Sequence, residues 1–298
     1  MSDAPARDAG GPPAGELLEV AVEAARSAGA LLAERVRQGA EREVSSKSTP
    51  TDLVSEADLA SERAIRELLA QRRPEDGFVG EEGDRVEGVS GLSWVVDPLD
   101  GTVNFLFGLP QWCVSVAVRD ERGTIAGAIY DPSREQLFSA TRAGRATLVG
   151  PEGTIDLGDE RAGDPHGSDL ATATLGDARA VRPRGSDLAT AMVATGFAYD
   201  ARVRAAQARV LERVLPRVRD IRRFGSAALD LAWTAAGRYD AYFERTVKQW
   251  DIAAGTLLCE AAGLRVVELP ELEDLPWGIL VAPPALCEPL LELVGGSA

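Results

Sequence analysis

Short runs rich in β-branched and aromatic residues fill the stretch from residue 76 to residue 149. Turn residues such as Arg122-Gly123 and Asp131-Pro132-Ser133 separate these runs, a pattern typical of β-strands joined by tight turns. We therefore predict an antiparallel sheet with strands at residues 78–79, 94–96, 113–118, 124–130 and 136–140. A hairpin turn at residues 143–146 predicts one further strand after them.

Two helices are predicted ahead of this sheet. Apolar residues recur at helical spacing over residues 16–37, which predicts an amphipathic helix with one buried face. A second helix follows residues 51–58 and continues to about Arg72. Residues 1–15 are rich in Ala, Gly and Pro without periodicity, so we expect a disordered N-terminal lead.

Helices and strands alternate in the second half of the chain. Helices are predicted at residues 203–214, 225–236, 250–262 and 284–294, and strands at 220–224, 239–244, 264–267 and 279–282. Such alternation predicts a mixed or partly parallel sheet. We expect a single α+β domain over residues 16–298, composed of an N-terminal half (16–150) and a C-terminal half (151–298).

A heptapeptide, Gly-Ser-Asp-Leu-Ala-Thr-Ala, occurs at residues 167–173 and again at 185–191. The offset is too short for a solenoid repeat with its own core. We interpret it as a local duplication that lengthened a surface insertion at residues 152–184. The second copy is predicted to start a helix, whose end then runs into a strand or turn at residues 192–198.

The net charge of −15 argues against partners that require a basic surface, namely nucleic acids and anionic membranes. It does not exclude anionic small molecules, because bound divalent cations can reverse the field in one cleft. No apolar run is long enough to span a bilayer and no signal peptide is visible. We therefore expect a chain with no nucleic-acid or membrane partner.

The few cysteine and histidine residues limit the catalytic mechanisms that are open to this chain. Cys113, Cys259 and Cys287 stand singly in apolar surroundings, which favours reduced thiols in a cytoplasmic protein. The single histidine, His166, lies in a polar segment that we interpret as a solvated loop. A phosphohistidine or zinc mechanism therefore has almost no residues to use.

The segment from Trp94 to Phe105 carries two carboxylates on what we predict to be a tight turn. Pro98 and Gly101 interrupt the strand ladder there, and Asp97 and Asp100 can converge on one point. The backbone N–H groups after them would be free. This combination can hold a phosphate through hard metal ions. The alternative is an Asp-rich turn with a helix N-cap.

Two further blocks accompany this segment: Gly-Glu-Glu-Gly at residues 80–83 and Trp-Asp-Ile-Ala-Ala-Gly at 250–255. In order and spacing, the three blocks resemble the signatures of the inositol monophosphatase family of Mg²⁺-dependent sugar phosphatases. The resemblance extends from about residue 17 to residue 294. It implies a layered αβαβα sandwich of the inositol monophosphatase and fructose-1,6-bisphosphatase type.

The resemblance also implies a metal site. It assigns the first metal to Glu81, Asp97 and the backbone carbonyl of Leu99. Asp97 bridges to a second metal, which Asp100 and Asp251 complete. Four carboxylates without a His or Cys ligand favour Mg²⁺, with Mn²⁺ as a possible substitute, over zinc. We expect two or three Mg²⁺ ions per active site.

The catalytic residues implied by the resemblance are Glu81, Thr102 and Asp58. Thr102 corresponds to a threonine that activates water, Asp58 orients its hydroxyl, and Glu81 shares the role of base. Asp58 also fits a simpler role as an acid in the first turn of a helix. Direct in-line attack by water, without a covalent intermediate, is the implied mechanism.

The resemblance also assigns the substrate contacts. The N–H groups of Gly101 and Thr102 would bind the phosphate, and Glu244 would accept hydrogen bonds from ring hydroxyls. An alternative for Glu244 is a surface acid paired with Arg245 or Lys248. The complete set of substrate-binding residues is Asp100, Gly101, Thr102, Gly225, Ser226, Ala227, Glu244 and Asp251.

These residues lead to a phosphatase hypothesis with inositol 1-phosphate as substrate. Histidinol phosphate, fructose 1,6-bisphosphate and a 3′-phosphonucleotide are alternatives with the same chemistry, because fold analogy does not fix the alcohol. A hypothesis of another class is a non-catalytic regulatory binding protein. The resemblance further implies a homodimer and inhibition by lithium.

Overall fold

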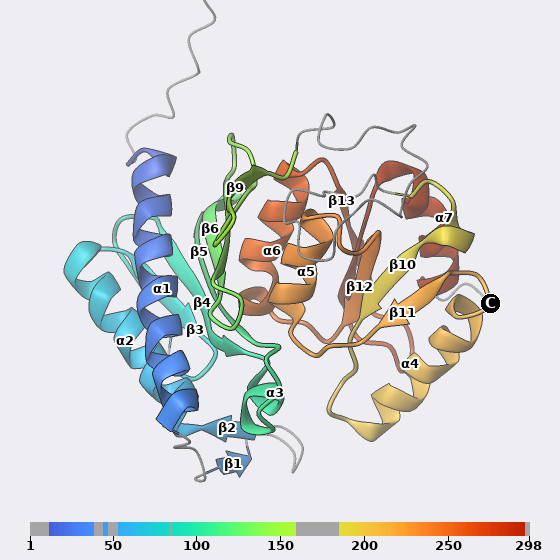
Figure 1. Cartoon of the computed structure of the whole chain (residues 1–298), viewed down its shortest axis with the longest axis horizontal. Helices are drawn as coiled ribbons and strands as arrows, with labels where there is room; N and C mark the ends of the chain where they lie inside the picture. Colours follow the sequence, from blue (N-terminus) through green and yellow to red (C-terminus); the bar gives the residue numbers. More distant parts are fainter. Residues whose placement is uncertain (1–11, 39–43, 47–52, 84, 159–184, 296–298) are drawn as a thin grey trace, which may run out of the picture.

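Helices and sheets alternate in layers across the molecule (Figure 1). The computed structural model describes residues 12–38, 44–46, 53–83, 85–158 and 185–295. One outer layer holds α1 and α2, the middle layer holds α5 and α6, and the other outer layer holds α4 and α7, with a sheet in each space between them. This order confirms the predicted α+β fold with αβαβα layers. The helices are α1 (Ala14–Gln38), α2 (Glu56–Arg72), α3 (Thr102–Leu106), α4 (Ala201–Val214), α5 (Ala227–Ala235), α6 (Gln249–Ala261) and α7 (Pro284–Val294).

The first sheet has seven strands in the order β3-β4-β5-β6-β7-β8-β9. Its strands are β3 (Gly77–Gly80), β4 (Ser93–Asp100), β5 (Cys113–Asp120), β6 (Gly123–Asp131), β7 (Gln136–Thr141), β8 (Thr147–Gly150) and β9 (Gly153–Asp156). The pairs from β4 onward are antiparallel, as predicted, whereas β3 runs parallel to β4. The sequence did not predict β9, which completes a hairpin with β8 at the start of the expected insertion. A separate antiparallel pair joins β1 (Val44–Ser46) to β2 (Leu53–Ser55).

The second sheet has five strands in the order β11-β10-β12-β14-β13. Its strands are β10 (Met192–Thr195), β11 (Asp220–Arg222), β12 (Ala241–Arg245), β13 (Arg265–Leu269) and β14 (Gly278–Ala282). β10 runs parallel to both β11 and β12, whereas β14 is antiparallel to β12 and β13. The predicted mixed sheet is therefore confirmed.

The second copy of the heptapeptide does not start a helix, contrary to the prediction. Residues Leu188–Thr190 form only a short 3₁₀ helix, and the following residues form the strand β10. The Asp240 carboxylate accepts hydrogen bonds from the N–H groups of Gly185 (3.0 Å) and Met192 (2.7 Å), which directs the chain into the sheet. The first copy, the rest of the expected insertion at 159–184, and residues 1–11 of the expected lead lie outside the described residues.

Small residues let the middle layer pack closely. A Cβ added at Gly255 of α6 would lie 2.6 Å from the Leu231 side chain of α5, and one at Gly127 of β6 would lie 2.9 Å from the Ala254 backbone of α6. Both helices contribute buried apolar side chains to a core that also includes side chains of both sheets. This close contact joins the two halves of the chain.

Candidate active site

One pocket collects residues from both halves of the chain. Its lining includes the bulged end of β4, the loop after β3 and the start of α6. Every residue that the sequence assigned to the site lines this pocket except Asp58 and Ser226, whose side chains are fully buried. The three sequence blocks, far apart along the chain, therefore lie around one cavity.

The end of β4 presents Asp97 to the pocket. The regular ladder is interrupted at Pro98, as predicted, by a shift in register between Asp97 and Asp100. The predicted tight turn is wrong, because β4 continues to Asp100. The Ser61 hydroxyl on α2 donates to the Pro98 carbonyl oxygen at 2.7 Å, and the Leu99 N–H donates to Asp97 Oδ1 at 3.0 Å. The bulge keeps both carboxylates on the pocket side of a continuous strand.

Asp100 lies at the junction of the two halves. Its carboxylate accepts hydrogen bonds from the Ser226 hydroxyl (2.7 Å), the Ala228 N–H (2.7 Å) and the Ala227 N–H (3.2 Å). It thus binds the N-terminus of α5, where the N–H groups lack partners within the helix. Burial raises the pKa of Asp100 to about 6 against the effect of these hydrogen bonds.

Asp251 belongs to the first turn of α6, and its Oδ2 accepts a hydrogen bond from the Lys248 N–H at 2.7 Å. Burial and then Asp100 raise the pKa of Asp251 well above its usual range. Burial raises the pKa of Asp97 in the same way, and repulsion from Glu81, Asp100 and Asp251 adds to it. The acids around this pocket therefore destabilise one another in their charged forms.

These acids suit a divalent cation by their chemistry. Repulsion among buried carboxylates is relieved by a bound cation, and all-oxygen donors match Mg²⁺. Within the described part of the chain, no three acidic, His or Cys side chains are gathered tightly enough to hold an ion. Asp97, Asp100 and Asp251 are each held by backbone N–H groups instead. The donor set fits the metal, and ligation requires these side chains to converge further.

The buried hydroxyl of Thr102 lies beside the buried carboxylate of Asp58. It follows Gly101, whose φ of +96° lies in the left-handed region that glycine adopts without strain. The Thr102 hydroxyl lies 2.7 Å from Asp58 Oδ1 and 3.1 Å from the Leu99 carbonyl oxygen, so it donates its proton to one of these two acceptors. Asp58 lies in the first turn of α2 and is fully buried. The hydroxyl oxygen retains a lone pair that can accept a hydrogen bond from water.

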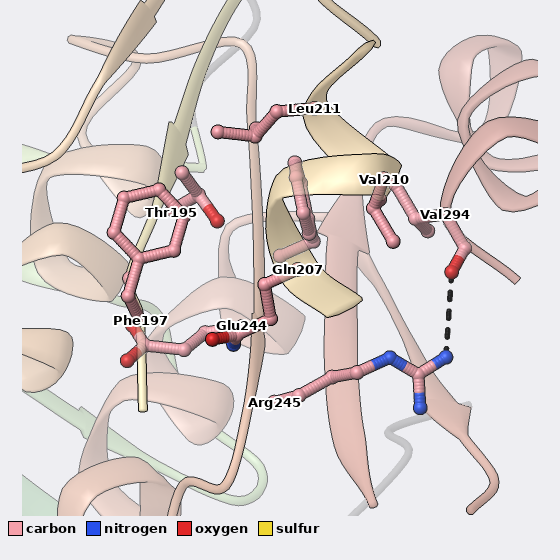
Figure 2. A pocket seen from close by; sticks show the side chains of 10 residues that line it. Thr195, Phe197, Gln207, Val210, Leu211, Glu244, Arg245 and Val294 are labelled. Carbon is pink, nitrogen blue, oxygen red and sulfur yellow. Dashed lines mark hydrogen bonds between the residues drawn. The ribbon is translucent and has the colours of Figure 1, made fainter. Parts of the chain in front are cut away.

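Glu244 forms another part of the wall, on β12. The Tyr242 hydroxyl donates to Glu244 Oε2 at 2.9 Å, and burial raises the pKa of Glu244 to about 7. Figure 2 shows that the Arg245 side chain points away from Glu244 and bonds to the Val294 carbonyl oxygen. Arg245 also donates to the carbonyl oxygens of Pro270 and Pro276. Pairing of Glu244 with Arg245, one of the alternatives from the sequence, is therefore not observed.

A second, narrow pocket lies beside Glu244 (Figure 2). It shares Glu244 and Phe197 with the first pocket, and it has room for about one water molecule. Gln207 of α4 contributes to its wall, and its side-chain oxygen accepts a hydrogen bond from the Ala198 N–H at 2.9 Å. This bond fixes the segment that leads from β10 along the first pocket.

Sequence reasoning missed several residues of the first pocket. Residues 197–200 follow β10, Arg223 follows β11, and residues 246–248 follow β12. These three strands are parallel, so their carboxyl ends meet at one edge of the sheet, where α/β proteins commonly bind ligands. The order of the strands places these residues at the pocket, but no short sequence motif marks them.

Comparisons with known proteins agree with this arrangement. The model of the inositol monophosphatase family matches residues 14–290. The inositol-1-monophosphatase SuhB of Mycobacterium tuberculosis is 40% identical over 254 residues, which cover 83% of this chain and 80% of that protein. The Nus factor SuhB of Pasteurella multocida is 38% identical over 249 residues, with 83% of each chain covered.

A solved structure supports the fold as well. The extragenic suppressor protein suhB from Bartonella henselae superposes with a TM-score of 0.77 at 31% identity and covers 95% of this chain and 99% of that one. No helix in the described residues is both long and apolar enough to cross a membrane.

Proposed function

Because the chain belongs to the inositol monophosphatase family and is a phosphatase, we propose that it hydrolyses inositol 1-phosphate to inositol and phosphate. The observation that carries this proposal is the gathering of Glu81, Asp97, Asp100 and Asp251 around one pocket that also contains Glu244. The four acids would bind the metal ions that neutralise the charge of the phosphate. Glu244 provides an acceptor for hydroxyl groups.

Members of the family depend on metal ions. In this chain Glu81, Asp97, the Leu99 carbonyl, Asp100 and Asp251 would hold two or three Mg²⁺ ions, or Mn²⁺ in their place. Bound Mg²⁺ supplies charge neutralisation at the phosphate and lowers the pKa of water. The mutual repulsion among the carboxylates of Glu81, Asp97, Asp100 and Asp251 supports this assignment.

The protein's own groups then orient the reactants and move the proton. The Thr102 oxygen accepts a proton from the attacking water as its own hydroxyl proton passes to the buried Asp58 carboxylate. Glu81 shares this role as a base. The N–H groups of Gly101 and Thr102 bind phosphate oxygens, and the turn Gly225-Ser226-Ala227 orients the alcohol. The water oxygen forms a bond to phosphorus in line as the bond from phosphorus to the alcohol oxygen breaks on the opposite side. The leaving oxygen takes up a proton from solvent to form the alcohol.

Phosphate release from a panel of substrates tests the proposal. The panel contains inositol 1-phosphate, fructose 1,6-bisphosphate, histidinol phosphate and a 3′-phosphoadenosine nucleotide at saturating Mg²⁺, with and without lithium. We expect preference for inositol 1-phosphate, inhibition by lithium and loss of release in Asp100→Asn. Preference for another substrate would overturn the inositol assignment and keep the phosphatase.

Some relatives carry the name Nus factor SuhB, which makes a regulatory binding protein the second candidate. The intact set of pocket carboxylates favours catalysis as the main role. Absence of phosphate release from all four substrates, in folded protein with Mg²⁺ present, would instead favour the regulatory role.

We also propose that the chain forms a homodimer in the cytoplasm. Three large apolar side chains are exposed on adjacent loops: Phe107 (74%), Leu109 (52%) and Phe224 (39%). Asn104 joins these loops, since its side-chain amide donates to the carbonyl oxygens of Gln111 and Phe224. Large apolar side chains that are exposed on neighbouring loops support an interaction site there. The three free, buried cysteines support a reducing compartment.

A further inference from the structure

Arg223 stands out among the residues that line the active-site pocket. It follows β11 directly, its side chain is exposed, and no signature block contains it. The pocket is otherwise acidic, with Glu81, the three aspartates of the signature blocks, Asp200 and Glu244 in its wall. Arg223 and Lys248 are the positive side chains among its lining residues.

The Arg223 guanidinium lies over the turn that should orient the alcohol. A Cβ at Gly225 would lie 2.5 Å from Arg223 Nη1, and Gly225 itself has a φ of +82°. The guanidinium also lies over the Phe197 ring, 5.7 Å from its centroid. Gly225 and the Phe197 ring thus keep the Arg223 guanidinium beside the turn that is proposed to orient the alcohol.

The Glu244 carboxylate also lies against a glycine, Gly196. A Cβ at Gly196 would collide with the Glu244 carboxylate, so the absence of a side chain at Gly196 gives that carboxylate its place. Arg223 lies near enough to lower the pKa of Glu244. The two opposite charges therefore line the same pocket, and each lies against a glycine.

Arg223 forms no ion pair with any carboxylate in the described part of the chain. Its neighbour Arg222 differs, since it donates to the Asp220 carboxylate at 2.5 Å and to the Ile221 carbonyl oxygen at 2.9 Å. Arg222 does not line the pocket. The planar fork of a guanidinium matches a carboxylate or a phosphate in two parallel hydrogen bonds.

We propose that Arg223 is a specificity-determining residue that binds a second anionic group, a carboxylate or a phosphate, on the alcohol part of the substrate. Glu244 binds a hydroxyl group next to it. Inositol 1-phosphate lacks this second anion, so Arg223 gives the enzyme a further class of substrate. The inference rests on the proposed phosphatase function and deepens its substrate range.

Two matched pairs of substrates test this role and separate the two anions. Glycerol 3-phosphate and 3-phosphoglycerate differ in a hydroxymethyl group against a carboxylate. Fructose 1-phosphate and fructose 1,6-bisphosphate differ in the second phosphate. For each pair, the ratio of kcat/KM for the anionic to the neutral member is measured at saturating Mg²⁺ in wild type, Arg223→Gln, Arg223→Lys and Arg222→Gln.

We expect Arg223→Gln to lower this ratio about tenfold for at least one pair, the size of one charge-assisted contact, with the change mainly in KM. Arg223→Lys should retain part of the ratio, and Arg222→Gln should retain all of it. Unchanged ratios in Arg223→Gln for both pairs would overturn the role of Arg223 while leaving the phosphatase function intact. Failure of the wild type to release phosphate from any substrate would overturn both.

Discussion

At the scale of single residues, the chemistry depends on where protons are held. Thr102→Ala removes the oxygen that accepts the proton from water and leaves Asp58 buried without this partner. We expect kcat to fall by about 10²-fold or more, with a smaller change in KM. Thr102→Ser should restore much of the rate because it restores the hydroxyl. A Thr102→Ala enzyme with near wild-type kcat would exclude this proton route.

Glu244 should confer a dependence on pH. Its pKa in the folded protein is raised to about 7, so its carboxylate is protonated below that pH and charged above it. Only the charged form accepts a hydrogen bond from a substrate hydroxyl at both oxygens. We therefore expect kcat/KM for inositol 1-phosphate to rise as the pH passes through about 7, and this step should be absent in Glu244→Gln. Identical pH profiles would contradict the contact.

At the scale of elements, the close packing of α5 against α6 determines whether replacing a glycine by alanine stabilises the protein. An alanine usually stabilises a helix relative to glycine by about 1 kcal/mol. At Gly255, however, the new Cβ would lie 2.6 Å from Leu231, and overpacking of this kind costs roughly 1–3 kcal/mol. We expect Gly255→Ala to lower Tm.

Gly15 in α1 is the matched control, because a Cβ there has no neighbour within 4 Å. Gly15→Ala should leave Tm unchanged or raise it. The two variants are compared by thermal unfolding followed by circular dichroism. An equal rise in Tm for Gly255→Ala and Gly15→Ala would show that α6 can move away from α5, which would contradict the close packing of the two helices.

The elements also show what the sequence alone could reveal. Periodicity predicted α1, because this helix buries one regular face. Short runs of β-branched and aromatic residues predicted the strands of the first sheet, of which β4 and β5 are buried on both faces. At residues 192–198 the sequence left a strand or a turn open, and it wrongly placed a helix before them. The distant carboxylate of Asp240 instead directs the chain into the strand β10. The signature blocks led to Asp97 and Asp251, whereas Arg223 has no motif. Its place in the pocket follows from the strand order, which a single sequence does not reveal.

At the scale of the whole molecule, the exposed apolar loops predict self-association. Phe107→Ser together with Phe224→Ser should convert a dimer into a monomer, since both remove exposed apolar area from the loops that Asn104 joins. Sedimentation velocity measures the change. Val89→Ser is the control, because Val89 is 87% exposed on another loop. A monomeric wild type, or a dimer unaffected by the double substitution, would contradict the proposed interface.

In the proposed mechanism, the pocket carboxylates hold divalent cations for phosphate hydrolysis. The most direct measurement is a Mg²⁺ titration of the chelator-treated protein, followed by calorimetry and by phosphate release from inositol 1-phosphate. We expect binding heat and activity to return together in wild type and in Glu121→Gln, whose exposed side chain lies outside the active-site pocket. Both should be lost in Asp97→Asn. Activity without Mg²⁺, or full Mg²⁺ binding and activity in Asp97→Asn, would exclude this role of the carboxylates.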